Sequence, residues 1–122
     1  MTATKTTDTA AVIHEHVRAF NARDLDALLA GFTEDALWVT GTTAVRGRVA
    51  LAEFFQDAMQ GLLPTLTVQS LVTEGSEAAC QLTETLTVHG DEQTFSIAGF
   101  YLLHNRRIAS AKIYREGKAE VG

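Results

Sequence analysis

The chain has 122 residues, 46% hydrophobic and 20% charged, which is the balance of one folded globular domain. The net charge of −5 and the absence of a basic cluster longer than Arg106–Arg107 exclude nucleic acid as an expected partner. One cysteine (Cys80) and no long apolar segment predict a cytoplasmic protein without disulfides or membrane contact. Residues 1–8 are expected to form a frayed Thr-rich leader, and residues 9–122 the domain.

Three helices are predicted in the first half of the chain. Between Thr9 and Asn21, apolar side chains recur every three or four residues, as on one face of a helix. Asp24 is a good N-cap for a second, short helix, and a strand from Ala36 to Thr40 follows it. A third helix is expected from Val49 to Gln60, because apolar residues again recur at helical spacing there.

The chain after Pro64 has the pattern of β-strands. Four runs are rich in β-branched and aromatic residues: Thr65–Thr73, Glu77–His89, Thr94–His104 and Arg107–Arg115. The turns between them are short, and short turns join antiparallel neighbours. We therefore expect an α+β domain in which three N-terminal helices and a curved antiparallel sheet enclose a pocket.

Alternation along the strands divides the side chains into two faces, although the pattern alone does not say which face is concave. Glu84 is unusual because it shares its face with Leu82 and Leu86, and a buried carboxylate must be protonated, paired or functional. The expected pocket is aromatic with a few polar groups. Its predicted lining consists of His16, Phe20, Trp38, Thr40, Phe55, Met59, Glu84, Gly99, Tyr101, Lys112 and Tyr114.

The pattern of the last strand, Arg107–Arg115, predicts which residues lie on the outer face of the sheet. Its alternation places Lys112 and Tyr114 on the pocket side and leaves Ala109, Ala111 and Ile113 as an apolar strip on the outer face. An exposed apolar strip on a sheet face is a surface for self-association. We therefore expect a homodimer formed through the convex face.

The segment AFNARDLDALLAGFTEDALWVTGT (Ala19–Thr42), followed by a helix and long strands, resembles the nuclear transport factor 2-like domains. Within that superfamily it is most similar to the SnoaL-like branch, and to its SgcJ/EcaC-type members in particular. The stretch from Gly47 to Gln56 and the ending RIASAKIYRE suit the same group. This resemblance implies a cone-shaped domain folded around one deep pocket, and polyketide-like aromatic substrates.

Two better-known enzymes of this superfamily are similar in fold, but their catalytic groups are not carried over. Matched to ketosteroid isomerase through AxNAxDLD, the oxyanion tyrosine falls at His16, the general-base aspartate at Thr40 and the second acid at Gly99. Only the first of these can do proton chemistry. The Asp–Arg–Asp arrangement of limonene epoxide hydrolase falls near Ile97, Gly99 and Ile113, so that mechanism is also not expected.

The residues leave a catalytic and a structural interpretation open. His16 or Glu84 could move a proton, while Tyr101, Trp38 or Lys112 binds the substrate oxygen. In the structural interpretation, the histidine is a hydrogen-bonded residue at the edge of the core, and the glutamate and lysine form an ion pair. No spacing of His, Cys, Asp and Glu indicates a metal site, and no cofactor is expected.

The leading functional hypothesis is a cofactor-independent acid–base enzyme of the cyclase, isomerase or dehydratase type. Its substrate would be a polyketide-like or other polycyclic carbonyl compound from natural-product biosynthesis. The alternative is a non-catalytic binding or accessory protein that holds a small aromatic molecule in the same pocket. A third possibility is a protein-association domain that acts through the outer face of the sheet.

Overall fold

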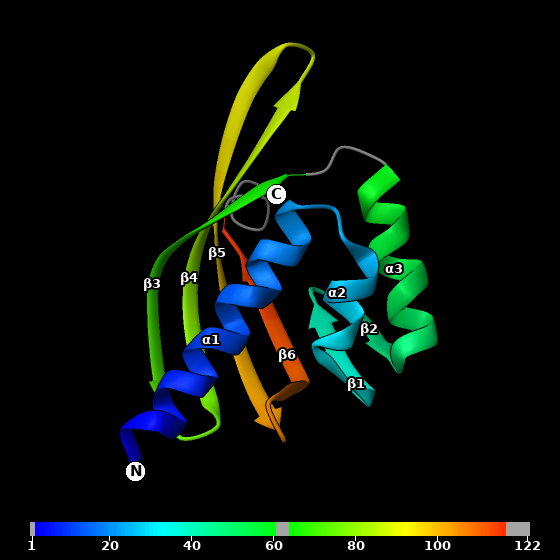
Figure 1. Cartoon of the computed structure of the whole chain (residues 1–122). Helices are drawn as coiled ribbons and strands as arrows, with labels where there is room; N and C mark the ends of the chain where they lie inside the picture. Colours follow the sequence, from blue (N-terminus) through cyan, green and yellow to red (C-terminus); the bar gives the residue numbers. More distant parts are fainter. Residues whose placement is uncertain (1, 61–63, 117–122) are drawn as a thin grey trace.

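The computed structural model, which describes residues 2–60 and 64–116, contains a curved six-stranded sheet with helices against one face (Figure 1). Met1 of the expected leader and residues 117–122 of the expected domain lie outside the described residues. The strand order across the sheet is β2-β1-β6-β5-β4-β3. The elements are α1 (Thr2–Asn21), α2 (Leu25–Ala30), β1 (Phe32–Thr40), β2 (Thr43–Arg46), α3 (Arg48–Gln60), β3 (Thr65–Glu74), β4 (Glu77–Val88), β5 (Asp91–His104) and β6 (Arg107–Arg115).

The α+β class and the antiparallel order of β3 to β6 confirm the expectation from sequence. Two pairings were not expected: β1 runs parallel to β6, and the short β2 pairs with β1. β2 has only four residues, and it is flanked by Gly41 and Gly47, which both have positive φ angles. Because glycines at such positions are typical of turns, the sequence pattern here indicated a turn and not a strand. α1 begins at Thr2 rather than at Thr9, in a stretch without an apolar stripe.

Two hydrogen-bonded contacts hold α1 along β3, one near each end of that strand. Near its start, the hydroxyl of Thr9 donates to the carbonyl of Gly75 at 2.6 Å. At its end, the amide of Asn21 donates to the carbonyl of Leu66 and accepts from the N–H of the same residue, both at 2.9 Å. The asparagine thereby pairs like a strand residue with the exposed edge of β3. These contacts set the rotation of the helix and turn its apolar stripe toward the sheet.

A bulge in β6 reverses the expected facing of its C-terminal half. Opposite the step from Leu102 to Leu103 on β5, β6 contains an extra residue, Ala109. Because one inserted residue moves all later side chains to the other face, the predicted facing of Lys112 and Tyr114 is wrong. The inward residues of β6 are Ile108, Ala111, Ile113 and Arg115, and the outward ones are Ser110, Lys112 and Tyr114.

The core lies between the inner face of the sheet and the helices, and it is strongly aromatic. Phe32, Trp38 and Phe55 pack with ring centroids 5.1 to 5.9 Å apart, mostly edge to face, which is a favourable arrangement of aromatic quadrupoles. Figure 1 shows α1 lying along the sheet, with α2 and α3 on the side of β1 and β2. No helix of the described residues is long and apolar enough to cross a bilayer.

Candidate functional site

A cavity of about 300 Å³ opens between α1, α3 and the inner face of the sheet. Five strands (β1, β3, β4, β5 and β6) and both long helices contribute to its wall, so its shape depends on the whole fold. It is lined by His16, Phe20, Trp38, Thr40, Phe54, Phe55, Ala58, Pro64, Leu66, Leu82, Glu84, Ile97, Tyr101, Ile113 and Arg115.

Most of the residues predicted from sequence meet in this cavity, including His16, Phe20, Trp38, Thr40, Phe55, Glu84 and Tyr101. Lys112 and Tyr114 do not, because the bulge in β6 turns them outward, where both are exposed. Met59 packs against the core without lining the cavity, and Gly99 is buried beneath Tyr101.

His16 occupies the deep end of the cavity. Its side chain is surrounded by aromatic rings, with centroids 5.6 Å from Phe32 and Trp38 and 5.9 Å from Tyr101. Burial lowers the pKa of the imidazole to about 4, because a charged ring would lose its hydration there. The ring is therefore neutral at pH 7, and its Nδ1 atom has no hydrogen-bond partner among the described residues.

Tyr101 places a phenol beside this histidine. Burial, with a smaller contribution from the neighbouring Cys80, raises the pKa of the phenol above its ordinary value, so the hydroxyl stays protonated. The ring lies along its own strand over Gly99, and a Cβ there would overlap the phenol hydroxyl. The absence of a side chain at Gly99 therefore leaves room for the hydroxyl of Tyr101. This hydroxyl lies over the residue that, by the resemblance to ketosteroid isomerase, corresponds to that enzyme's second acid.

Glu84 and Arg115 form an ion pair at the mouth of the cavity, between Oε1 and Nη2. The expected partner of the glutamate, Lys112, instead lies on the outer face with its Nζ atom 5.4 Å from the ring centroid of Tyr114. The side chain of Glu84 is 14% exposed and that of Arg115 is 43% exposed, so water reaches this end. The guanidinium also stacks over Phe95, at 5.1 Å from the ring centroid.

Several lining residues were missed from the sequence. Leu82 and Ile97 share faces with Glu84 and Tyr101, so strand alternation could have added them. Arg115 and Ile113 could not have been placed, because no sequence signal marked the bulge that turns them inward. The remaining missed residues are Phe54, Ala58, Pro64 and Leu66. Among the described residues, no group of three His, Cys, Asp or Glu side chains could hold a metal ion.

Comparison with known proteins shows the family to which the chain belongs. Residues 13–111 match the family model of the SnoaL-like domain. The chain belongs to the SnoaL-like family. None of the curated proteins matches its sequence. Family membership and cavity together make it a pocket protein of this family.

Solved structures share the fold over almost the whole chain. A candidate ketosteroid isomerase from Kribbella flavida superposes with a TM-score of 0.83 at 21% identity, covering 93% of this chain and 81% of its own. A candidate polyketide cyclase from Xanthomonas campestris gives 0.81 at 19% identity, with 96% of each chain covered. TerC, co-crystallised with polyporic acid, gives 0.83 at 15% identity, covering 93% and 95%. These likenesses show the ketosteroid isomerase-like fold expected from the sequence.

Proposed function

We propose that this SnoaL-like protein is a cofactor-independent enzyme that moves a proton on a polyketide-like or other polycyclic carbonyl compound. The reaction would be a cyclisation, an isomerisation or a dehydration. One observation carries the proposal: the deep end pairs a neutral imidazole, unpartnered at Nδ1 among the described residues, with a buried phenol. The similar folds of a candidate polyketide cyclase and of TerC with polyporic acid support this substrate class.

The chemistry begins with a proton on the carbon next to the substrate carbonyl. A nitrogen of His16 accepts this proton, and the C–H electron pair moves into an enolate. The hydroxyl of Tyr101 donates a hydrogen bond to the enolate oxygen, in a site where burial strengthens that bond. The imidazolium then returns the proton to a different atom of the substrate.

The low pKa of His16 is compatible with this role. An imidazolium that forms beside an enolate gains a neighbouring negative charge, which favours the charged form of the ring. His16 is also already in its basic form at neutral pH, since burial lowers its pKa to about 4. The site therefore needs no prior deprotonation before it accepts a proton.

The wall of the cavity suits flat rings. Phe20, Trp38 and Phe55 present aromatic surface, and the volume of about 300 Å³ lies at the lower end of the range for small-molecule sites. A ring system of about two or three fused rings is the size that such a cavity accepts. We therefore expect compact polycyclic ligands to bind by stacking on Trp38.

A second candidate function is binding without turnover. Thr40 and Gly99 stand where the resemblance to ketosteroid isomerase places a base and an acid, and neither can exchange a proton at neutral pH. Glu84 is engaged in an ion pair. In this alternative, His16 and Tyr101 hold a carbonyl or hydroxyl of a carried molecule by hydrogen bonds alone.

Proton exchange separates the two functions. Compact polycyclic ketones are incubated with the protein in D₂O, and deuterium on the carbon next to the carbonyl is followed by NMR. The enzyme proposal expects exchange above background that is lost in His16→Gln and kept in His14→Gln, a matched change at an exposed site on the same helix. Ketones that raise the melting temperature without exchanging deuterium would favour the binder.

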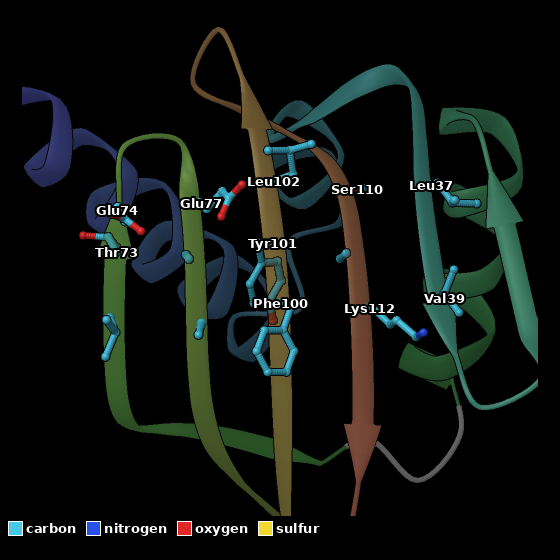
Figure 2. Close-up of a pocket in the computed structure, with 14 residues that line it drawn as sticks. Leu37, Val39, Thr73, Glu74, Glu77, Phe100, Tyr101, Leu102, Ser110 and Lys112 are labelled. Atoms are coloured by element: carbon cyan, nitrogen blue, oxygen red, sulfur yellow. The ribbon is translucent and has the colours of Figure 1, made fainter.

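We also propose that the protein is a homodimer formed through the outer face of the sheet. Phe100 and Leu102 are 52% and 44% exposed there, over a shallow hollow of about 550 Å³. Figure 2 shows them on β5, between Glu77 on β4 and Lys112 on β6. A two-fold axis along β5 lays β4 of one copy over β6 of the other and brings these opposite charges together.

Sedimentation tests the homodimer directly. The wild-type protein is expected to sediment as a dimer at micromolar concentration, and Phe100→Glu as a monomer, because the two-fold axis along β5 would bring the new carboxylates of the two copies together in the interface. His104→Glu, an exposed change beyond the hollow on the same strand, serves as the control and is expected to stay dimeric. A monomeric wild-type protein would contradict the proposal.

A further inference from the structure

The mouth of the cavity carries a cationic side chain that the proposed proton transfer does not use. Arg115, the last residue of β6, is the one lysine or arginine of the described part of the chain that lines the cavity. Its side chain is 43% exposed, whereas His16 at the deep end is 6% exposed. A ligand could therefore contact Arg115 while its other end lies out of water.

Two contacts orient the guanidinium and leave most of its donors available. Nη2 donates to Oε1 of Glu84, and the planar group stacks over the ring of Phe95. A guanidinium has five N–H donors in a rigid fork. Apart from that one bond to Glu84, the described residues give Arg115 no hydrogen-bond acceptor. The guanidinium of Arg115 is therefore held in place, while N–H donors remain with which it can bind an oxygen atom of a ligand.

A second arginine lies close to the lining of the cavity. Arg23 donates to the carbonyls of Phe20 and Pro64, at 3.3 and 3.4 Å, and both of these residues line the cavity. Its guanidinium is thus held by backbone carbonyls, whereas that of Arg115 is itself part of the lining. A cationic side chain in the lining attracts an anionic group of a ligand.

The length of the cavity separates this charge from the deep end. Arg115 pairs with Ile97 on β5, and the hydroxyl of Tyr101 lies over Gly99, two residues further along the same strand. At about 3.3 Å per residue, the two levels are about 7 Å apart. The lining between them includes the apolar Leu82 and Ile113. A ligand that reaches both ends must therefore be elongated, apolar in the middle and polar at each end.

We propose that Arg115 binds a carboxylate of the ligand, so that the substrate is an elongated aromatic acid whose anionic end stays at the mouth. The guanidinium fork matches the two oxygens of a carboxylate, which is the strongest form of this contact. Glu84 competes for the same donors and so limits the affinity for the acid. The inference rests on the proposed function only for what happens at His16; the recognition of the acid stands apart from turnover.

Two probes with the same rings test the proposal. 6-Hydroxy-2-naphthoate carries a carboxylate at one end and a hydroxyl at the other, and 6-hydroxy-2-naphthamide replaces the carboxylate with a neutral amide. Calorimetry at pH 7.5 is expected to show the acid binding about tenfold more tightly than the amide to the wild-type protein. In Arg115→Gln, this preference is expected to fall to within about twofold, while the affinity for the amide is kept.

A second variant predicts the opposite sign. Glu84→Gln removes the competing carboxylate and nearly preserves the shape of the side chain, so the preference for the acid is expected to rise by about threefold or more. Arg107→Gln, at the other end of the same strand and exposed, removes a matched guanidinium outside the cavity and should leave the preference unchanged.

Equal affinities of acid and amide in the wild-type protein would overturn the proposal, as would a preference that survives in Arg115→Gln. Failure of both probes to bind also counts against it. Should Arg115→Gln not fold, Arg115→Lys keeps the charge without the fork and is expected to give an intermediate preference. If the wild-type protein prefers the acid but catalyses no deuterium exchange, only the enzyme proposal fails. If it catalyses exchange but does not prefer the acid, only the proposed carboxylate contact of Arg115 fails.

Discussion

At the deep end of the cavity, His16 and Tyr101 are 6% and 5% exposed and neutral, whereas at the mouth Glu84 and Arg115 meet solvent as an ion pair. Burial explains the difference, because a charge at the deep end would lose its hydration, while water and a partner stabilise charges at the mouth. One cavity thus combines an end suited to hydrogen bonding and proton transfer with an end suited to recognising charge.

Removing the titratable group at the deep end should have the largest effect, and removing the one at the mouth a smaller effect. His16→Gln is expected to lower the rate of deuterium exchange on a bound ketone by about 100-fold or more, because it removes the proton acceptor. Glu84→Gln is expected to change that rate by less than about tenfold, since its contact is with Arg115 at the mouth. If Glu84→Gln stops deuterium exchange and His16→Gln does not, the assignment of proton transfer to the deep end is wrong.

Tyr101→Phe sharpens the comparison within the deep end. Loss of the donor to the enolate oxygen is expected to slow exchange by about 10- to 100-fold. The free energy of unfolding should change by less than about 1 kcal/mol, because no described residue loses a hydrogen bond with this hydroxyl. Chemical denaturation checks stability, and a large loss of stability would show a structural role for the hydroxyl.

Gly99→Ala is expected to displace the phenol. Its Cβ would overlap the hydroxyl of Tyr101 and lie 2.7 Å from two ring carbons, closer than van der Waals contact allows. We expect a loss of about 1–3 kcal/mol in unfolding free energy and an exchange rate near that of Tyr101→Phe. Gly31→Ala is the control, since the nearest atom to its new Cβ is 3.4 Å away. Equal stability of both variants would show that the phenol can move aside freely.

The buried imidazole also predicts how stability depends on pH. Because the pKa of His16 is lowered to about 4 in the folded protein, the unfolded chain binds more protons between pH 4 and 6.5. Its contribution to stability is therefore fully present above pH 6.5 and is lost as the pH falls. Between pH 7.5 and pH 5 this amounts to about 2 kcal/mol. Urea unfolding should show that loss in the wild-type protein and a smaller one in His16→Gln; equal losses would contradict it.

The sequence predicted the class of fold and much of the cavity for identifiable physical reasons. Helical spacing placed His16 and Phe20 on one stripe, and strict alternation placed Glu84 on the same face as Leu82, which the structure shows to be the inner one. Both periodicities are local, so they can be recognised without knowing how the elements pack.

The remaining features depend on contacts between distant segments. A single extra residue, Ala109, turns Arg115 inward and Lys112 outward, and nothing in the local sequence distinguishes it from an ordinary strand residue. The low pKa of His16 likewise follows from its burial among the rings of Phe32 and Trp38 on β1 and of Tyr101 on β5. Sequence therefore supplied the candidates, and packing decided their partners and protonation.

The protonation state of His16 at mildly acidic pH tests the central claim most directly. In protein labelled with ¹⁵N at histidine, the ring nitrogen shifts of His16 are recorded at pH 5.5. A pKa of about 4 predicts a neutral ring, with only about 3% protonated, whereas a histidine of ordinary pKa would be about nine-tenths protonated there. A neutral His16 is the result this account predicts; a protonated one would contradict the dry, uncharged deep end on which the proposed proton transfer depends.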